Sequence, residues 1–147
     1  MIKEKLTFGI CVILPTALLC SVILWSCSQN NSERSGNSKL EKGIGPIQNL
    51  ELGAIDESMA EAGRAIYDSK CTACHNPTEK LIGPPQAGVM QRRSPEWVMN
   101  LLLNTDEMLD KDPIANAMLK EYNNVRMTNQ NLTEQEARRI LEYLRTI

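Results

Sequence analysis

The stretch KCTACHNP, residues 70–77, places two cysteines three positions apart and a histidine directly after the second. His75 is the only histidine of the 147 residues. A zinc or iron–sulfur site needs four nitrogen or sulfur ligands, which Cys71, Cys74 and His75 cannot complete. A thioredoxin-like pair belongs between a strand and a helix, and no strand pattern flanks this one. A disulfide across so short a loop would constrain little of the unfolded chain.

The remaining use of the spacing Cys-x-x-Cys-His is covalent attachment of haem. Two thiols at this spacing can add to the two vinyl groups along one edge of the porphyrin. The adjacent histidine is then carried under the ring, where its imidazole reaches the iron. The motif therefore predicts one haem c, bound through thioethers at Cys71 and Cys74, with His75 as an axial iron ligand.

Residues 1–27 have the features of an export signal. A start with two lysines is followed by an apolar run from Leu6 to Trp25 and then by a strongly polar stretch. Ser26-Cys27 ends the run as a bacterial lipobox does, which predicts cleavage before Cys27 and lipidation of its thiol. An uncleaved membrane anchor is the alternative, since the run is about long enough to span a bilayer. Either interpretation tethers the rest of the chain outside the cytoplasm. The lipid-anchored form is expected on the cell membrane or outer membrane, facing the periplasm.

The rest of the chain divides into a linker and a domain. Residues 28–51 are mostly polar and are expected to form a flexible linker, and residues 52–147 are expected to form the packed domain. The chain has only one Phe, three Tyr and two Trp, so a small core would gain from a bound group to pack around. The net charge of -2, from 16 basic and 18 acidic side chains without a basic run, argues against a nucleic-acid partner.

Four N-capping signals divide the domain into helices. The signals are, in order, Asp56, Ser94-Pro95, Asp112-Pro113, and Thr133 with Glu136 as a capping box. The first predicted helix runs to about Lys70, and the last carries an apolar stripe at helical spacing. No strand pattern and no internal repeat occur. The sequence therefore predicts an all-α domain of about four to five helices.

Three stretches resemble the class I cytochromes c: GRAIYDSKCTACH (63–75), IGPP (82–85) and RMTNQNLTEQEARRILEYLR (126–145). The longer stretch that begins with RRSPEWVMNLLLN (92–104) and runs through DPIANAMLKEYNN (112–124) to Arg145 resembles the small lipoprotein type of Bacteroidetes-like bacteria. The resemblance implies a small cytochrome c fold around a covalently bound haem. In that fold a first helix with Gly63 and Tyr67 crosses a last helix with Tyr143. It also implies that the Pro84 carbonyl accepts the ring N–H of His75, which orients the imidazole and raises its basicity.

The second axial ligand cannot be another histidine, so methionine is the natural candidate. The domain contains Met59, Met90, Met99, Met108, Met118 and Met127. Met127 lies in the polar, irregular stretch NNVRMTNQN (123–131), where a large apolar side chain has little packing role. The resemblance also places a ligand methionine shortly before the last helix. Met127 is therefore the expected ligand, with Met118 as the runner-up and Met108 next, although Thr128 stands where the family usually has proline.

Two more residues are candidates for contacts with the cofactor. Trp97 could flank a haem propionate or serve as an ordinary core residue. Arg92, with Arg93 beside it, could pair with the propionates, and a solvated basic pair is the competing interpretation.

The predicted function is that of a membrane-tethered monohaem electron carrier in a periplasmic or extracytoplasmic respiratory chain, not an enzyme. A thioether ligand favours ferrous iron and raises the potential. The expected partners are redox proteins, and the resemblance suggests a terminal oxidase or an anaerobic reductase such as nitrous oxide reductase; the protein is expected to be a monomer. The alternatives are a haem-based sensor or peroxidase-like domain with an open iron position, and a module docked permanently in a larger complex.

Overall fold

The computed structural model describes residues 42–147, so the predicted export signal and Cys27 lie outside the described residues. The helices are α2 (Glu57–Lys70), α3 (Val89–Arg92), α4 (Pro95–Leu103), α5 (Thr105–Lys111), α6 (Pro113–Glu121) and α7 (Glu134–Leu144). No strand occurs in this range, so the predicted all-α fold is confirmed. The short α3 and α5 are the helices that the capping signals did not mark. Over residues 42–147, no helix is both long and apolar enough to cross a membrane.

The predicted caps begin the four longer helices. Asp56 accepts from the Met59 N–H at 2.9 Å, and Ser94 accepts from the Trp97 N–H at 3.2 Å. Asp112 accepts from the N–H groups that follow it, and Thr133 and Glu136 form the reciprocal capping box before α7. Each cap satisfies backbone donors that a helix leaves unpaired at its start, so these helix starts could be read from neighbouring residues alone.

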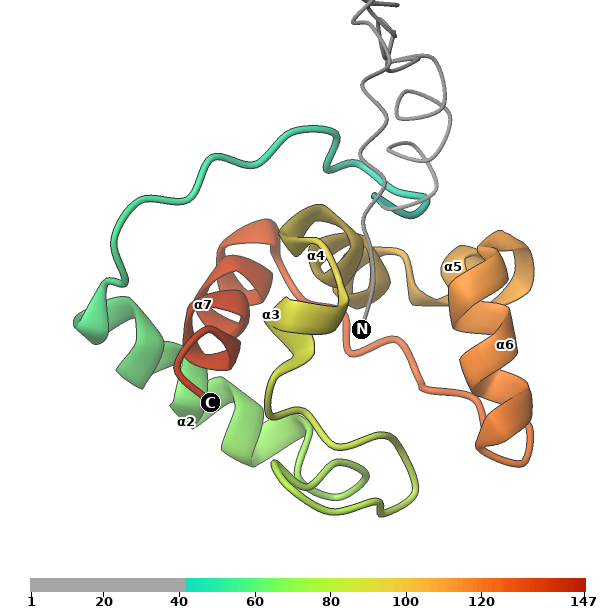
Figure 1. Ribbon diagram of the computed structural model, residues 1–147. Helices are drawn as coiled ribbons and strands as arrows, with labels where there is room; N and C mark the ends of the chain where they lie inside the picture. Colours follow the sequence, from blue (N-terminus) through green and yellow to red (C-terminus); the bar gives the residue numbers. More distant parts are fainter. Residues whose placement is uncertain (1–41) are drawn as a thin grey trace, which may run out of the picture.

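Helices α2 and α7 cross at close range (Figure 1). A methyl group at Gly63 in α2 would lie 1.8 Å from the main-chain oxygen of Arg139 in α7, so only glycine allows the two backbones to approach this closely. One turn further along, the rings of Tyr67 and Tyr143 lie 5.2 Å apart and tilted by 56°. This crossing fixes the end of α2, from which the Cys-x-x-Cys-His motif continues.

A buried carboxylate, Glu142, joins α7 to the start of α2. It accepts from the Asp56 N–H and from Arg145, both at 2.8 Å, and is paired with Arg138. Burial raises the pKa of Glu142, but these hydrogen bonds and the two arginines outweigh burial, so its pKa is lowered overall. The charge of Glu142 is therefore stabilised in the folded protein.

The segment 42–50 packs along α4 and α5, although the sequence placed it in the flexible linker. Asn100, fully buried in α4, donates to the main-chain oxygens of Lys42 and Ile47 at 2.8 Å and accepts from the Ile47 N–H at 2.9 Å. Ile47 belongs to the core. Three apolar residues, Ile44, Ile47 and Leu50, and the buried amide of Asn100 give this part of the chain a packed position that its composition did not predict. The other predicted boundaries of the export signal, the linker and the domain remain predictions.

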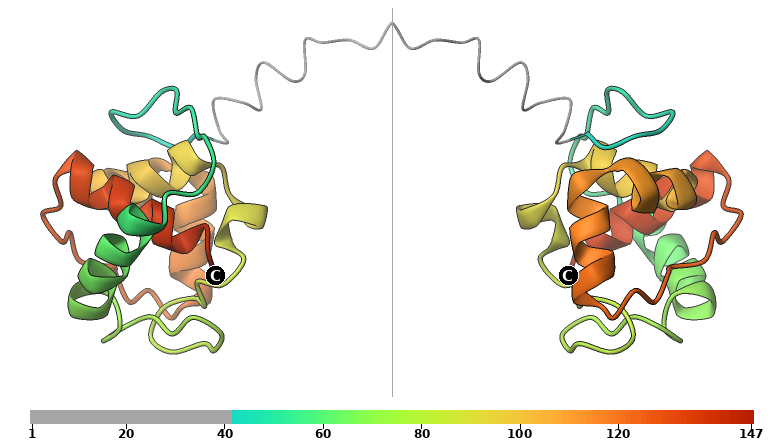
Figure 2. Two further views of the ribbon diagram at one scale, coloured as in Figure 1. Left: turned by 90° about the vertical axis from the view of Figure 1, so that its left-hand side faces the viewer. Right: turned by 90° about the vertical axis from the view of Figure 1, so that its right-hand side faces the viewer.

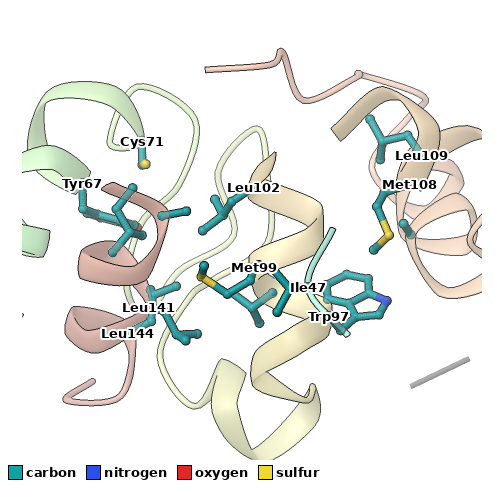
Figure 3. Packing of buried hydrophobic residues seen from close by; sticks show 14 residues of the cluster. Ile47, Tyr67, Cys71, Trp97, Met99, Leu102, Met108, Leu109, Leu141 and Leu144 are labelled. Atoms are coloured by element: carbon teal, nitrogen blue, oxygen red, sulfur yellow. The ribbon is translucent and has the colours of Figure 1, made fainter. Parts of the chain in front are cut away.

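The core extends between the helices from Tyr67 and Cys71 at one end to Met108 and Leu109 at the other (Figure 3). Met99 and Leu102 of α4 occupy its middle. Figures 1 and 2 both show segment 42–50 at one end of the domain and the loop of residues 71–88 at the opposite end. The start of the described chain is therefore remote from the loop that carries the motif.

Candidate functional site

A cavity of about 240 Å³ lies between the helices and two loops, residues 71–86 and 122–130. Its walls are mainly apolar. They come from six helices as well as the loops, and include Tyr67, Val89, Val98, Leu101, Leu102, Leu109, Ala115, Leu119, Ile140 and Leu144. All three residues of the motif, Cys71, Cys74 and His75, line the same cavity. An apolar pocket with a few convergent polar groups is the usual form of a cofactor site.

The motif follows directly from the last turn of α2. The Cys71 N–H donates to the main-chain oxygen of Tyr67 at 2.8 Å. The N–H groups of Cys74 and His75 then donate to the main-chain oxygen of Cys71 at 3.1 and 2.9 Å. Both thiols are free. Cys71 is buried, which raises the pKa of its thiol to about 11, whereas Cys74 is exposed. The tight turn thus presents the two thiols and the imidazole to one cavity.

The ring of His75 is held from two sides. Its Nδ1 lies 3.0 Å from the Pro84 oxygen, the partner that the resemblance implied. Gly83 lies against the ring, and a methyl group there would come within 2.7 Å of Nδ1. The Gly83 N–H donates to the Cys74 oxygen at 2.8 Å, which fixes this loop to the motif. With Nδ1 occupied, Nε2 is the ring nitrogen left for a metal.

Two of the six methionines named above, Met118 and Met127, line the cavity. Met127 lies outside any helix and is half-buried. Met118 lies in α6, and its sulfur is 3.6 Å from Nη2 of Arg93. Met108 is fully buried elsewhere, with its sulfur 2.9 Å from the Ile44 N–H, so the third choice of the sequence analysis does not reach the cavity. The structure thus reduces the candidate thioethers to two.

Trp97 and Arg92 also line the cavity, but their polar atoms are engaged within the protein. The indole N–H of Trp97 donates to Asp112 at 3.1 Å, so Trp97 forms a wall and is not a free donor. Arg92 donates to the main-chain oxygens of Ala87 and Pro85 at 2.8 and 3.1 Å. These contacts brace the loop before α3.

Two side-chain atoms are buried without a hydrogen-bond partner in the described part of the chain, the Tyr67 hydroxyl and Nε of Arg93. Both residues line the cavity. Because buried polar atoms are normally paired, these two indicate that a ligand with polar groups belongs there. A haem, with an apolar ring and two carboxylates, fits this combination together with the donor set of two thiols, an imidazole and a thioether. No cluster of three or more His, Cys, Asp or Glu side chains that could hold a bare metal ion occurs within residues 42–147.

Sequence reasoning missed one residue next to the motif histidine. Gln86 lines the cavity, and its Nε2 lies 2.8 Å from Nδ1 of His75. A glutamine eleven positions from its partner follows no known spacing, so no sequence signal could have identified it. The sequence analysis noticed Arg93 only as half of a basic pair. Two features distinguish it from Arg92: its Nε is buried, and its guanidinium carbon lies 5.3 Å from the centre of the Trp97 ring.

The domain is all-helical and surrounds an apolar cavity. The Cys-x-x-Cys-His motif lies in the wall of this cavity, and two methionine side chains line it. These features together define the class of small c-type haem proteins. Comparison with known families agrees: the model of the family Cytochrome c matches residues 60–147, and the chain belongs to that family. Membership implies covalently attached haem c and electron transfer, since members are typically electron carriers.

Solved structures support this assignment. The chain is 39% identical to a cytochrome c from Rhodothermus marinus, with a TM-score of 0.70 over 74% of this chain and 94% of that one. An engineered form of the Rhodothermus protein bound to a carbene intermediate is 38% identical, with a TM-score of 0.67 over 74% and 95%. A cytochrome c domain from Pseudomonas putida is 31% identical, with a TM-score of 0.53 over 57% and 85%. No protein of curated function matches the chain.

Proposed function

We propose that this cytochrome c is a membrane-tethered monohaem carrier of single electrons, with Cys71 and Cys74 as the thioether positions and His75 and Met127 as the axial ligands. The observation that carries the proposal is that these four residues, from two separate loops, line one apolar cavity. The bound haem supplies the one-electron chemistry, and no bond of a substrate is made or broken.

The residues of the chain would hold the cofactor and exclude water from it. The Pro84 carbonyl orients the His75 imidazole through Nδ1 and leaves Nε2 toward the iron. Apolar walls from α4, α6 and α7 lower the local polarity, which together with a thioether ligand favours the reduced state. Arg93, with its unpaired Nε, is a stronger candidate than Arg92 for contact with a propionate.

Met127 is favoured over Met118 for two reasons. It lies in an irregular segment before α7, where the backbone can adjust to the iron, and family members carry their ligand methionine before the last helix. Met118 is held in α6, and its sulfur already contacts Arg93. Replacing Met127 with alanine should abolish the weak red methionine–iron band, whereas the same change at Met118 should leave it. The reverse result would assign the ligand to Met118.

Electrons would enter and leave near Cys74, at the mouth of the cavity. Ile82 and Val125 line the cavity and are 49% and 53% exposed, and Leu81, which precedes Ile82 in the chain, is 51% exposed. Small exposed apolar surfaces suit the brief contacts of electron-transfer partners. The proposed partner is a terminal oxidase or an anaerobic reductase, such as a nitrous oxide reductase. The carrier would bind this partner as a monomer.

The tether is proposed from the sequence: export, lipidation at Cys27, and a periplasm-facing position on the cell membrane or outer membrane. The described chain begins at the end of the domain opposite the motif loop (Figure 2), which supports a carrier whose cavity mouth points away from its anchor. A tether of this kind would raise the concentration of the carrier at the membrane surface and would still allow the domain to reorient toward its partners.

Mass spectrometry of the mature protein, combined with its absorption spectrum, tests the proposal. A mass that includes one covalent haem and a lipid at Cys27, with a low-spin ferric spectrum showing the methionine–iron band, supports it. A high-spin spectrum that shifts on adding cyanide would instead favour the sensor or peroxidase-like alternative, and loss of the pigment in acidic organic solvent would refute covalent attachment.

A further inference from the structure

Three atoms beside the motif histidine form a nearly equilateral triangle. Nδ1 of His75 lies 3.0 Å from the Pro84 oxygen and 2.8 Å from Nε2 of Gln86, and Nε2 of Gln86 lies 2.9 Å from the same Pro84 oxygen. The backbone N–H of Gln86 donates to the main-chain oxygen of Asn76 at 3.2 Å, which fixes Gln86 next to the motif. Two side chains thus compete for one carbonyl.

The hydrogens available in this triangle decide which bonds can coexist. The imidazole carries at most one hydrogen on Nδ1, and it must be there when Nε2 binds iron, so Nδ1–H donates to the Pro84 oxygen. The two N–H bonds of an amide diverge more widely than the corner of the triangle, so only one of them points inward. The Pro84 oxygen has two lone pairs and can accept this second hydrogen as well.

The orientation of the Gln86 amide is assigned from this network. A flipped amide would place its oxygen against the Pro84 oxygen at the same 2.9 Å separation, with no hydrogen between the two. The assigned orientation places the nitrogen there and gives the carbonyl a second donor. The repulsion between two oxygens therefore favours the amide as a donor to Pro84.

We propose that Gln86 is a positioning residue that raises the redox potential of the haem iron by sharing the Pro84 carbonyl with His75. A carbonyl that accepts from two donors binds each of them less strongly. The Nδ1–H of His75 is then less polarised and the imidazole is a weaker electron donor, which stabilises the ferric state less. This inference rests on the proposed function, because it requires His75 to be an iron ligand.

The substitution Gln86→Leu removes the competing donor while keeping a side chain of similar bulk. The carbonyl then serves His75 alone, so the potential should fall. We expect a shift of up to about tenfold in the relative stability of the two oxidation states, which is ~59 mV for one electron. The matched control is Gln91→Leu in α3, an exposed glutamine that does not line the cavity, and its potential should equal that of the wild type.

A second variant, Gln86→Glu, places a carboxylate beside Nδ1–H. It should accept that hydrogen directly, make the imidazole a stronger donor, and lower the potential further than Gln86→Leu does. Potentials are measured by spectroelectrochemical titration, and a low-spin spectrum in each variant verifies that both axial ligands are retained. Loss of thermal stability at an unchanged potential would show that Gln86 has a structural role only, and so overturns the proposal.

A rise in the potential of Gln86→Leu would also overturn it, since that result requires the amide to present its oxygen to His75. These outcomes are separate from failure of the proposed function. A wild-type protein without covalent haem, or without a His–Met spectrum, would refute the function before any variant is made. A normal wild-type spectrum with an unresponsive Gln86→Leu variant refutes only the role of Gln86.

Discussion

The crossing of α2 and α7 depends on a single missing methyl group. In the variant Gly63→Ala, the new Cβ would lie 1.8 Å from the main-chain oxygen of Arg139 and 3.0 Å from the Ile140 nitrogen. Ordinary contact begins at 3.4 Å, so the two backbones must separate locally by about 1.6 Å. Neither atom belongs to a flexible side chain, so the strain cannot be relieved by a rotamer change.

The expected loss of stability follows from two opposing effects. Alanine favours the helix over glycine by about 1 kcal/mol. Forced separation of packed elements costs about 1–3 kcal/mol or more, and poorer packing along the crossing costs about as much as one truncated core side chain, roughly 2–5 kcal/mol. The net destabilisation should be about 3 kcal/mol, which lowers the Tm of a domain of this size by more than ~10 °C.

The assay is thermal and guanidinium unfolding of the haem-bound protein, followed by circular dichroism. The matched control is Gly53→Ala, because a methyl group at Gly53 meets no atom within 4 Å and should change stability by less than about 0.5 kcal/mol. If Gly63→Ala is as stable as Gly53→Ala, the crossing of α2 and α7 is not limited by backbone contact and the reasoning fails.

Three further predictions concern the site and its support. Gly83→Ala should press on the His75 ring and move the ferric spectrum toward high spin, and an unchanged spectrum would contradict the packing described above. The lowered pKa of Glu142 contributes stability that is complete above the ordinary glutamate value of about 4.3 and is lost as the pH falls below it. Glu142→Gln should therefore lose about 1–3 kcal/mol at pH 7 and show a flatter acid dependence in unfolding titrations; a pH profile parallel to the wild type would count against this. In haem-free protein at about pH 8, peptide mapping after alkylation should find Cys74 modified well before Cys71, whose pKa of about 11 and burial keep it a protected thiol; equal rates would exclude that difference.

Features that depend on neighbours in the sequence were predicted from the sequence alone. The spacing of Cys71, Cys74 and His75 indicated haem attachment because the three residues must act within one turn of chain. The caps at Asp56 and Thr133 are local for the same reason, since a cap satisfies backbone donors two or three residues away. Family membership and the all-helical fold agree with these predictions.

Other features depend on residues that only folding brings together. Which methionines line the cavity is decided by how α6 and the loop after it pack, and the sequence could rank Met127 and Met118 only by their local surroundings and by the family resemblance. The mainly polar composition of the linker hid the packing of Ile47, because its hydrogen-bond partner, Asn100, lies far along the chain.

The sequence by itself indicated covalent haem attachment and determined the helical class of this protein, because covalent spacing and helix capping are short-range. The tertiary structure alone decided the surroundings of His75, in which Gln86 shares the Pro84 carbonyl, and the use of the Trp97 N–H by Asp112. Hydrogen bonds of this kind depend on ångström-scale distances between side chains, which are set by the packing of whole helices and loops and not by the order of residues along the chain.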